Sequence, residues 1–159
     1  MATIPLPPDF SEFLKLCDQH EVRYVLVGGY AVAYHGHPRT TGDMDVFVER
    51  SSDNAVRLVT VFHEFGFREP EITPELFLEP GAIIRIGVPP LKLEVFNEIS
   101  GVTFEECFAQ AVETEQCRVR IRVIALHQLL KNKLASGRNK DLADVDELNR
   151  LYPTGEQPS

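Results

Sequence analysis

The segment 24–48 constrains this chain more than any other part of its sequence. It reads YVLVGGYAVAYHGHPRTTGDMDVFV, which predicts a short apolar strand at 24–27, a turn of two glycines, a short helix, a polar loop and a second strand at 43–48. Residues two apart on a strand project from the same face, so Asp43 and Asp45 are expected to lie side by side. Any fold of this chain must therefore accommodate two like charges at the start of a buried strand.

The aspartate pair and the glycines before it predict the chemistry of the segment. Two carboxylates this close raise each other's pKa unless a cation lies between them, and Mg²⁺ commonly binds carboxylate oxygens together with water and phosphates. Gly28 and Gly29 leave backbone N–H groups free at a helix start, where phosphate oxygens bind well. Capping beside Gly42 is a poor explanation for both aspartates, although glycines also serve tight turns. A metal site beside a phosphate-binding turn indicates phosphoryl or nucleotidyl transfer.

Transfer with two metal ions requires a third carboxylate near the pair, ideally from a neighbouring strand. Glu94 is the candidate, in the strand-like segment LKLEVF at 91–96. The alternation of residues places Glu94 on the same face as Lys92, opposite the apolar face. The alternative for Glu94 is an exposed strand glutamate that pairs with Lys92.

Three further residues are candidate contacts for phosphate oxygens. Arg39 and Thr41 lie in the polar loop directly before the aspartates, and Lys133 lies in the helix-like segment LKNKLASGR. An arginine in a loop is otherwise usually solvated, and Lys131 is an interchangeable surface candidate in the same segment. Arg39, Thr41 and Lys133 are expected to bind the anionic part of a nucleotide.

The composition bounds the class of protein. The 159 residues fit a single domain, 1–159, with an ordered core at about 9–152, and 43% of them are hydrophobic. No apolar run approaches the ~20 residues that span a membrane, and the start MATIPLPPDF lacks signal-peptide features, which predicts a cytoplasmic location. The net charge of −8 argues against general adhesion to nucleic acid, although 118–140 carries seven basic residues and no acidic one.

The periodicity of apolar residues predicts a mixture of helices and strands. Helices are expected at about 9–20, 52–65, 104–112, 126–134 and 142–151, and further strands at 82–87, 91–96 and 118–123. The segment 69–81 reads as a loop. These elements predict an α+β fold, with a small mixed twisted sheet, helices mainly on one face and a helical C-terminal segment.

Four sequence patterns carry a family resemblance. They are VGGYAVAYHG, PRTTGDMDVFVE, LKLEVF and LLKNKLASGRNKDLADVDEL. Together they resemble the nucleotidyltransferase superfamily that includes DNA polymerase beta. Within it, the chain is most similar to small bacterial stand-alone nucleotidyltransferases related to abortive-infection toxins, and to the minimal nucleotidyltransferases. The resemblance runs from about Phe10 to about Leu151 and implies the nucleotidyltransferase fold.

The resemblance implies a role for each acidic candidate. Asp43 and Asp45 match the metal-binding pair of the family, and Glu94 stands where the family has its third acid. All three are thus implied to be catalytic metal ligands. The third acid is most often aspartate in this subgroup, and glutamate is longer by one methylene, so the reach of Glu94 is the main departure from the pattern.

The resemblance also implies which residues hold the nucleotide. Gly28 and Gly29 stand where the family binds the triphosphate, and Gly29 replaces a serine that many relatives use. Lys133 matches a lysine expected near the nucleotide, and Asp141 matches a recurrent polar position.

The implied activity is transfer of a nucleoside monophosphate from a nucleoside triphosphate, ATP among the candidates, to an acceptor hydroxyl, with release of pyrophosphate. Mg²⁺ or Mn²⁺ is the implied cofactor. The acceptor is left open among tRNA or another RNA end, a protein and a small molecule, as are a toxin–antitoxin role and the oligomeric state. The alternatives are a non-catalytic nucleotide- or partner-binding module of the antitoxin or regulatory type, and a phosphatase with Asp43 as nucleophile. The phosphatase is disfavoured because Asp43 precedes its strand.

Overall fold

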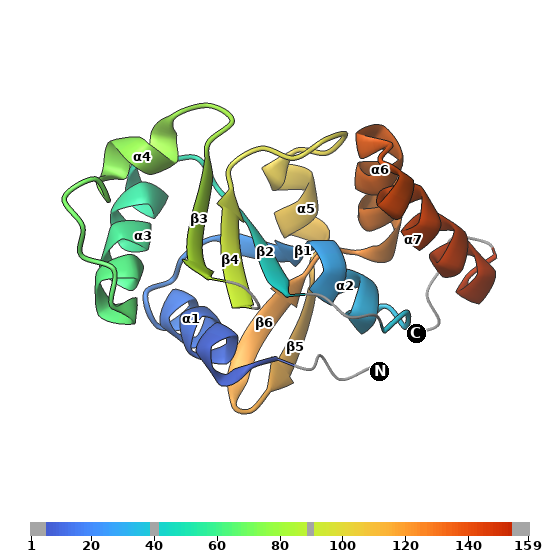
Figure 1. Ribbon diagram of the computed structural model, residues 1–159, viewed down its shortest axis with the longest axis horizontal. Coiled ribbons are helices and arrows are strands. Elements are labelled where there is room, and N and C mark those ends of the chain that lie inside the picture. The colour runs from blue at the N-terminus through green and yellow to red at the C-terminus, as the bar shows by residue number, and fades with distance from the viewer. Residues whose placement is uncertain (1–5, 39–41, 89–90, 154–159) are drawn as a thin grey trace.

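A computed structural model describes residues 6–38, 42–88 and 91–153, and its six strands form one sheet (Figure 1). In chain order the elements are α1 (Pro8–Gln19), β1 (Tyr24–Val27), α2 (Gly28–Tyr34), β2 (Asp43–Val48), α3 (Ser52–Phe65), α4 (Pro74–Leu78), β3 (Ile83–Val88), β4 (Leu91–Phe96), α5 (Phe104–Gln110), β5 (Val112–Gln116), β6 (Val119–Val123), α6 (Leu126–Ser136) and α7 (Asn139–Leu151). Within the described ranges, no helix is long and apolar enough to cross a membrane.

The sheet is mixed and has the strand order β3-β4-β2-β1-β6-β5. β2 lies in its centre, antiparallel to β1 and parallel to β4. The two outer hairpins are antiparallel, β3 with β4 and β5 with β6, and β6 runs parallel to β1. The expected α+β fold with a small mixed sheet is confirmed.

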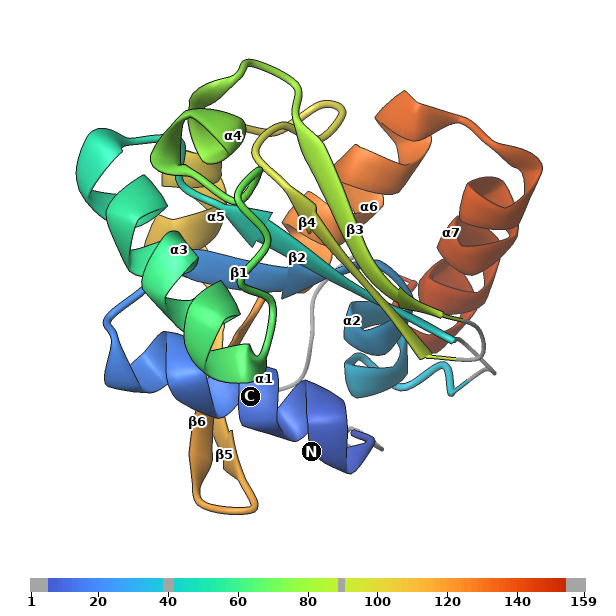
Figure 2. The same cartoon turned by 60° about the vertical axis from the view of Figure 1, so that its left-hand side comes forward.

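Helices cover both faces of the central strands. On one face, α1 and α3 meet through Phe13 and Phe62, whose ring centroids are 5.8 Å apart, and they lie on the same side of the sheet in Figures 1 and 2. On the other face, Phe47 of β2 packs against Phe104 of α5 at 5.3 Å. Helices are therefore divided more evenly between the faces than the sequence suggested. The reason is that successive residues of β2, Val46 and Phe47, are both buried, so each face requires cover.

Most element boundaries follow from local signals. Ser51 caps α3 by accepting a hydrogen bond from the Asn54 N–H (3.3 Å), and Gly66 ends the helix in the left-handed conformation (φ 110°). Two elements were not expected. The short helix α4 lies inside the segment read as a loop, and β5 overlaps the expected helix at 104–112 only at Val112 and otherwise lies where no element was expected.

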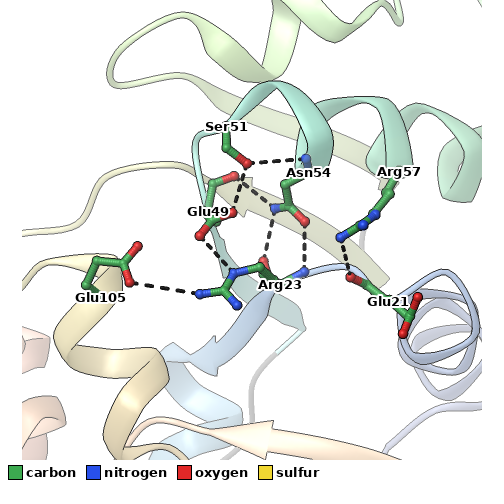
Figure 3. A network of polar contacts seen from close by, with 7 residues as sticks. All are labelled: Glu21, Arg23, Glu49, Ser51, Asn54, Arg57 and Glu105. Carbon is green, nitrogen blue, oxygen red and sulfur yellow. Dashed lines mark hydrogen bonds and ion pairs between the residues drawn. The ribbon is translucent and has the colours of Figure 1, made fainter.

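A buried asparagine joins the start of β1 to the end of β2 and to α3 (Figure 3). The Asn54 side chain is fully buried and accepts a hydrogen bond from the Arg23 N–H (2.8 Å). Its amide donates to the carbonyls of Arg23 (3.1 Å) and Glu49 (2.9 Å). Asn54 thus satisfies three backbone groups at the end of the sheet opposite the glycine turn.

Asn54→Ala is expected to lower the free energy of unfolding by about 2–4 kcal/mol, because it leaves these buried backbone groups without partners. Urea unfolding measures the change. Thr60→Ala in the same helix is the control, since the Thr60 hydroxyl is exposed and donates to the Val56 carbonyl (3.3 Å) within the helix. An Asn54→Ala protein as stable as the control would contradict this assignment.

Candidate active site

The sheet register brings acidic residues from two strands together. In the parallel pairing of β2 with β4, Asp43 lies opposite Lys92 and Asp45 lies opposite Glu94. Residues opposite each other in register project from the same face, so Asp43, Asp45 and Glu94 share one face of the sheet. This is the grouping that the sequence predicted, and it places Glu94 within electrostatic range of Asp45.

The turn after β1 touches the same aspartate. Val27 pairs with Asp45, and α2 begins at the next residue, Gly28. Gly28 has φ +67°, and a Cβ atom there would lie 2.2 Å from Asp45 Oδ2. The Asp45 carboxylate therefore occupies space that the side chain of any other residue at 28 would fill.

Two cations lie beside the outer members of the acidic group. Lys92 Nζ is 3.9 Å from Asp43 Oδ1, and Arg85 Nε is 3.5 Å from Glu94 Oε2. The Asp43 side chain is 39% exposed and that of Arg85 is 61% exposed, so both pairs are weak and readily broken. As these side chains are placed, no three His, Cys, Asp or Glu residues among those described form a ready-made metal site.

Asp45 is the electrostatic centre of the group. Burial, and then the charges of Glu94 and Asp43, raise the pKa of Asp45 from 3.8 to about 7, while Lys140 and Lys133 act in the opposite direction. The ionised form of Asp45 is therefore under-compensated by the protein. A bound cation on this face would supply the missing charge.

A cavity of about 280 Å³ opens beside Asp45. One wall is the end of β1 with the glycine turn, and another is formed by the C-terminal helices. Its described lining consists of Val27, Gly28, Gly29, Asp45, Ile83, Phe96, Glu98, Ile99, Ser100, Asn132, Lys133, Ser136, Arg138, Lys140 and Asp141. Three basic side chains, those of Lys133, Arg138 and Lys140, thus line the cavity that Asp45 and the glycines also line.

Lys133, Arg138 and Lys140 form a basic wall of the cavity, and buried acids hold Lys133 and Arg138 in place. Lys133 is 4% exposed, and its amine lies 3.1 Å from Asp141 and 2.9 Å from Asp144. Asp141 also accepts hydrogen bonds from Ser136 Oγ and from Arg138 Nε, both at 2.7 Å. Burial alone would raise the pKa of Asp141, but the hydrogen bonds from Arg138, Ser136 and Lys133 outweigh it and lower the pKa to about 2.

A close contact fixes the first C-terminal helix against the sheet. Gly101, in the turn after β4, has φ +79°, and a Cβ atom there would lie 2.6 Å from Ala135 Cβ of α6. One turn away, Asn132 donates a hydrogen bond to the Ser100 carbonyl (2.9 Å). These contacts hold α6 against the turn that follows β4.

The residues proposed from the sequence are only partly gathered in this cavity. Gly28, Gly29, Asp45 and Lys133 line it, whereas Asp43 and Glu94 lie beside Asp45 and outside the described lining. Arg39 and Thr41 lie outside the described residues.

Among the cavity residues that were not candidates are Ser136, Arg138 and Lys140, whose polar side chains lie near the candidate Lys133 in the chain. Arg138 and Lys140 belong to the run of basic residues at 118–140, and all three residues lie in the pattern LLKNKLASGRNKDLADVDEL, but neither signal singled them out.

Comparisons with known proteins identify the family and the fold. The model of a family described as "Nucleotidyl transferase of unknown function (DUF2204)" matches residues 8–157. No curated protein sequence matches the chain. A solved structure, that of an antigenic nucleotidyltransferase-like protein from Paracoccidioides brasiliensis, matches with a TM-score of 0.52 over 92% of this chain and 78% of that chain. The two sequences are 17% identical, so this likeness shows the fold alone.

Gly28→Ala is expected to lower the free energy of unfolding by about 2–4 kcal/mol, through the left-handed backbone and the clash with Asp45. Gly137→Ala is the matched control. Its φ of +68° imposes the same backbone strain, but its nearest contact would be the Leu134 carbonyl oxygen at 3.8 Å. Chemical denaturation measures the loss of stability in each variant, and the difference between the two losses gives the cost of the clash with Asp45. Equal losses would show that the Asp45 side chain does not exclude a Cβ atom at position 28.

Asp45→Asn is expected to stabilise the protein, and more so at pH 8 than at pH 4. The pKa of Asp45 is raised in the folded state, so the stability present below about 3.8 is lost as the pH rises to about 7. Asparagine has no proton to lose. It stays neutral at every pH and so avoids the cost of a buried negative charge. Thermal unfolding at several pH values measures the difference, and an unchanged or lower melting temperature at pH 8 would contradict it.

Proposed function

We propose that this chain, which belongs to a family of nucleotidyl transferases of unknown function, moves a nucleoside monophosphate from a nucleoside triphosphate to an acceptor hydroxyl and releases pyrophosphate. The observation that carries the proposal is the position of Asp45. This residue contacts the glycine turn, shares a face with Asp43 and Glu94, and lines a cavity with three basic side chains.

The acids fit a divalent cation by their chemistry. Three carboxylates on one face offer the oxygen ligands that Mg²⁺ and Mn²⁺ prefer, and the raised pKa of Asp45 reflects a negative charge without sufficient compensation. Asp43, Asp45 and Glu94 would hold the metal once the weak pairs with Lys92 and Arg85 open. A metal bound there would make the acceptor hydroxyl more acidic and balance charge on the pyrophosphate.

The basic wall would bind the triphosphate. Arg138 and Lys140 are exposed residues that line the cavity, and the charge of Lys140 acts on Asp45. Lys133 is held by two buried acids, so it would act on the phosphates from a fixed position rather than by reaching out to them. On the other side of the cavity, Gly28 and Gly29 have no side chains, so phosphate oxygens could approach their backbone closely. Orientation of the phosphates and electrostatic stabilisation would provide most of the rate enhancement.

One observation favours a second candidate function, a non-catalytic module that binds a nucleotide or a partner. In the part of the chain that is described, the acids do not form a ready-made group of three, and Glu94 is turned to Arg85. A protein that kept the cavity and lost the metal geometry would bind a triphosphate without transferring it. The two functions differ in whether label moves to an acceptor.

Incubation with triphosphates labelled in the α-phosphate, Mg²⁺ or Mn²⁺ and fractionated RNA, protein and metabolites is expected to label one acceptor class. Asp43→Asn, Asp45→Asn and Glu94→Gln should each reduce the labelling rate by on the order of a hundredfold or more, because each removes a charge that acts on the transition state. Glu115→Gln, on the exposed strand β5, is the control.

A readout independent of activity tests the metal assignment. Mg²⁺ at pH 8 is expected to raise the melting temperature of the wild type and not that of Asp45→Asn. Full transferase activity of Asp45→Asn would reject the catalytic assignment. Metal-dependent triphosphate binding without labelling of any acceptor would favour the binding module.

A further inference from the structure

Strand β3 is an edge of the sheet, and the hydrogen bonds show which of its backbone groups face outward. The Lys92 N–H donates to the Gly42 carbonyl (2.9 Å), so Lys92 and the alternate residues of β4 bond toward β2. The residues between them therefore bond toward β3. The bond from the Asn97 N–H to the Ala82 carbonyl (3.3 Å) fixes the same alternation at the far end of the hairpin.

Three residues of β3 consequently present their N–H and C=O groups away from the sheet. The register pairs Ile84 with Val95 and Ile86 with Leu93 as bonded neighbours, which leaves Ile83, Arg85 and Gly87 facing outward. All three are exposed, Ile83 by 45%. Among the described residues, no hydrogen bond uses the outward backbone groups of these three. Such an edge is a template for another strand.

An apolar groove lies directly beside this edge, on the face covered by α1 and α3. It has a volume of about 220 Å³ and is lined by Phe10, Phe65, Phe67, Ile86 and Leu93, together with Asp9 and Gly87. A strand added next to β3 would lie about 4.8 Å away and would direct every second side chain toward this face. The groove has room for one such apolar side chain.

We infer that β3 is a docking edge for an extended segment of another protein, which adds as a seventh strand. The backbone of the segment would bond Ile83, Arg85 and Gly87, and an apolar side chain would enter the groove beside Ile86. An acidic residue of the segment would face Arg85, whose side chain is 61% exposed and only weakly paired with Glu94. Backbone bonds provide affinity in this mode of recognition, and the groove and Arg85 provide specificity.

The charge of Arg85 argues against a second copy of this chain as the occupant. Arg85 is the middle of the three outward residues, so antiparallel pairing of two β3 strands over their full length would place two Arg85 side chains opposite each other. Like charges directly opposite destabilise a strand pair. An acidic segment has the complementary charge.

The opposite edge of the sheet would repel the same segment. A two-residue turn at Cys117 and Arg118, both with positive φ, closes the β5–β6 hairpin beside the pair Gln116 and Val119. Glu113 and Glu115 then face outward from β5. Glu113 is paired with Arg122 (3.3 Å), but the exposed Glu115 has the wrong charge for an acidic segment, which leaves β3 as the edge that fits better.

A synthetic peptide tests the inference without nucleotide or metal, and so independently of transferase activity. The probe is an eight-residue peptide of alternating valine and threonine with a central glutamate, and its matched control has a central lysine. The glutamate peptide is expected to bind about fivefold more tightly, and Arg85→Glu should reverse this preference. Arg150→Glu, an exposed arginine on α7, is the control.

Hydrogen exchange and a proline variant locate the binding. The peptide should slow exchange at the amides of Ile83, Arg85 and Gly87, while those of Ile84 and Ile86 are already protected in the free protein. Ile83→Pro removes an outward N–H at the first strand position, which proline tolerates, and should abolish binding without unfolding the protein.

Three results would overturn the inference. They are no binding at millimolar peptide, binding that Ile83→Pro leaves unchanged, and protection confined to other strands. A dimer in sedimentation that Ile83→Pro dissociates would likewise overturn it, since the edge would then belong to a second copy.

Discussion

Repulsion between carboxylates on one face of the central strands is the constraint on which the rest of this structure depends. The parallel register of β2 and β4 sets Asp45 beside Glu94, and burial under the glycine turn strengthens the effect. A sheet arranged only for stability would not place acids in this way, because each ionised group makes the others harder to ionise. Such an arrangement persists where function requires it, as is common for perturbed carboxyl groups in clefts.

The C-terminal helices supply the opposing charge, and they do so from a rigid position. Lys133 is buried between Asp141 and Asp144, and the same Asp141 binds Arg138. The acids of α7 therefore hold Lys133 of α6 and Arg138 of the connecting turn in place. The close packing of Gly101 on α6 completes this positioning. The cavity thus has Asp45 and the glycine turn on one side and the side chains of Lys133, Arg138 and Lys140 on the other.

The local features of this fold were readable from the sequence. The alternation in 91–96, the spacing of the acids in 43–48 and the apolar periodicity of 52–65 all depend on near neighbours, and they predicted β4, β2 and α3 correctly. Strand β5 was missed because VETEQ is a half-exposed edge strand whose polar residues resemble the end of a helix. The helix α4 had a usable signal, a threonine followed by proline and glutamate, in a segment otherwise poor in periodicity. Two features of the site arise instead from contacts between distant segments. The Asp45 carboxylate occupies the space that a Cβ atom on Gly28 would fill, and Arg138 and Lys140 line the same cavity as Asp45. No local pattern contains that information.

The two sides of the cavity come from opposite ends of the chain. Gly28 and Lys133 are 105 positions apart. Gly36, just after α2, packs against the end of α7, because a Cβ atom built on it would lie 3.4 Å from Leu151 and 3.5 Å from Tyr152. Contacts between such remote segments form late, because a long loop must close before they become favourable. A growing polypeptide on the ribosome would therefore expose its acids before α6 and α7 have been made. The cavity with both kinds of charge would form only after these helices have packed against the sheet.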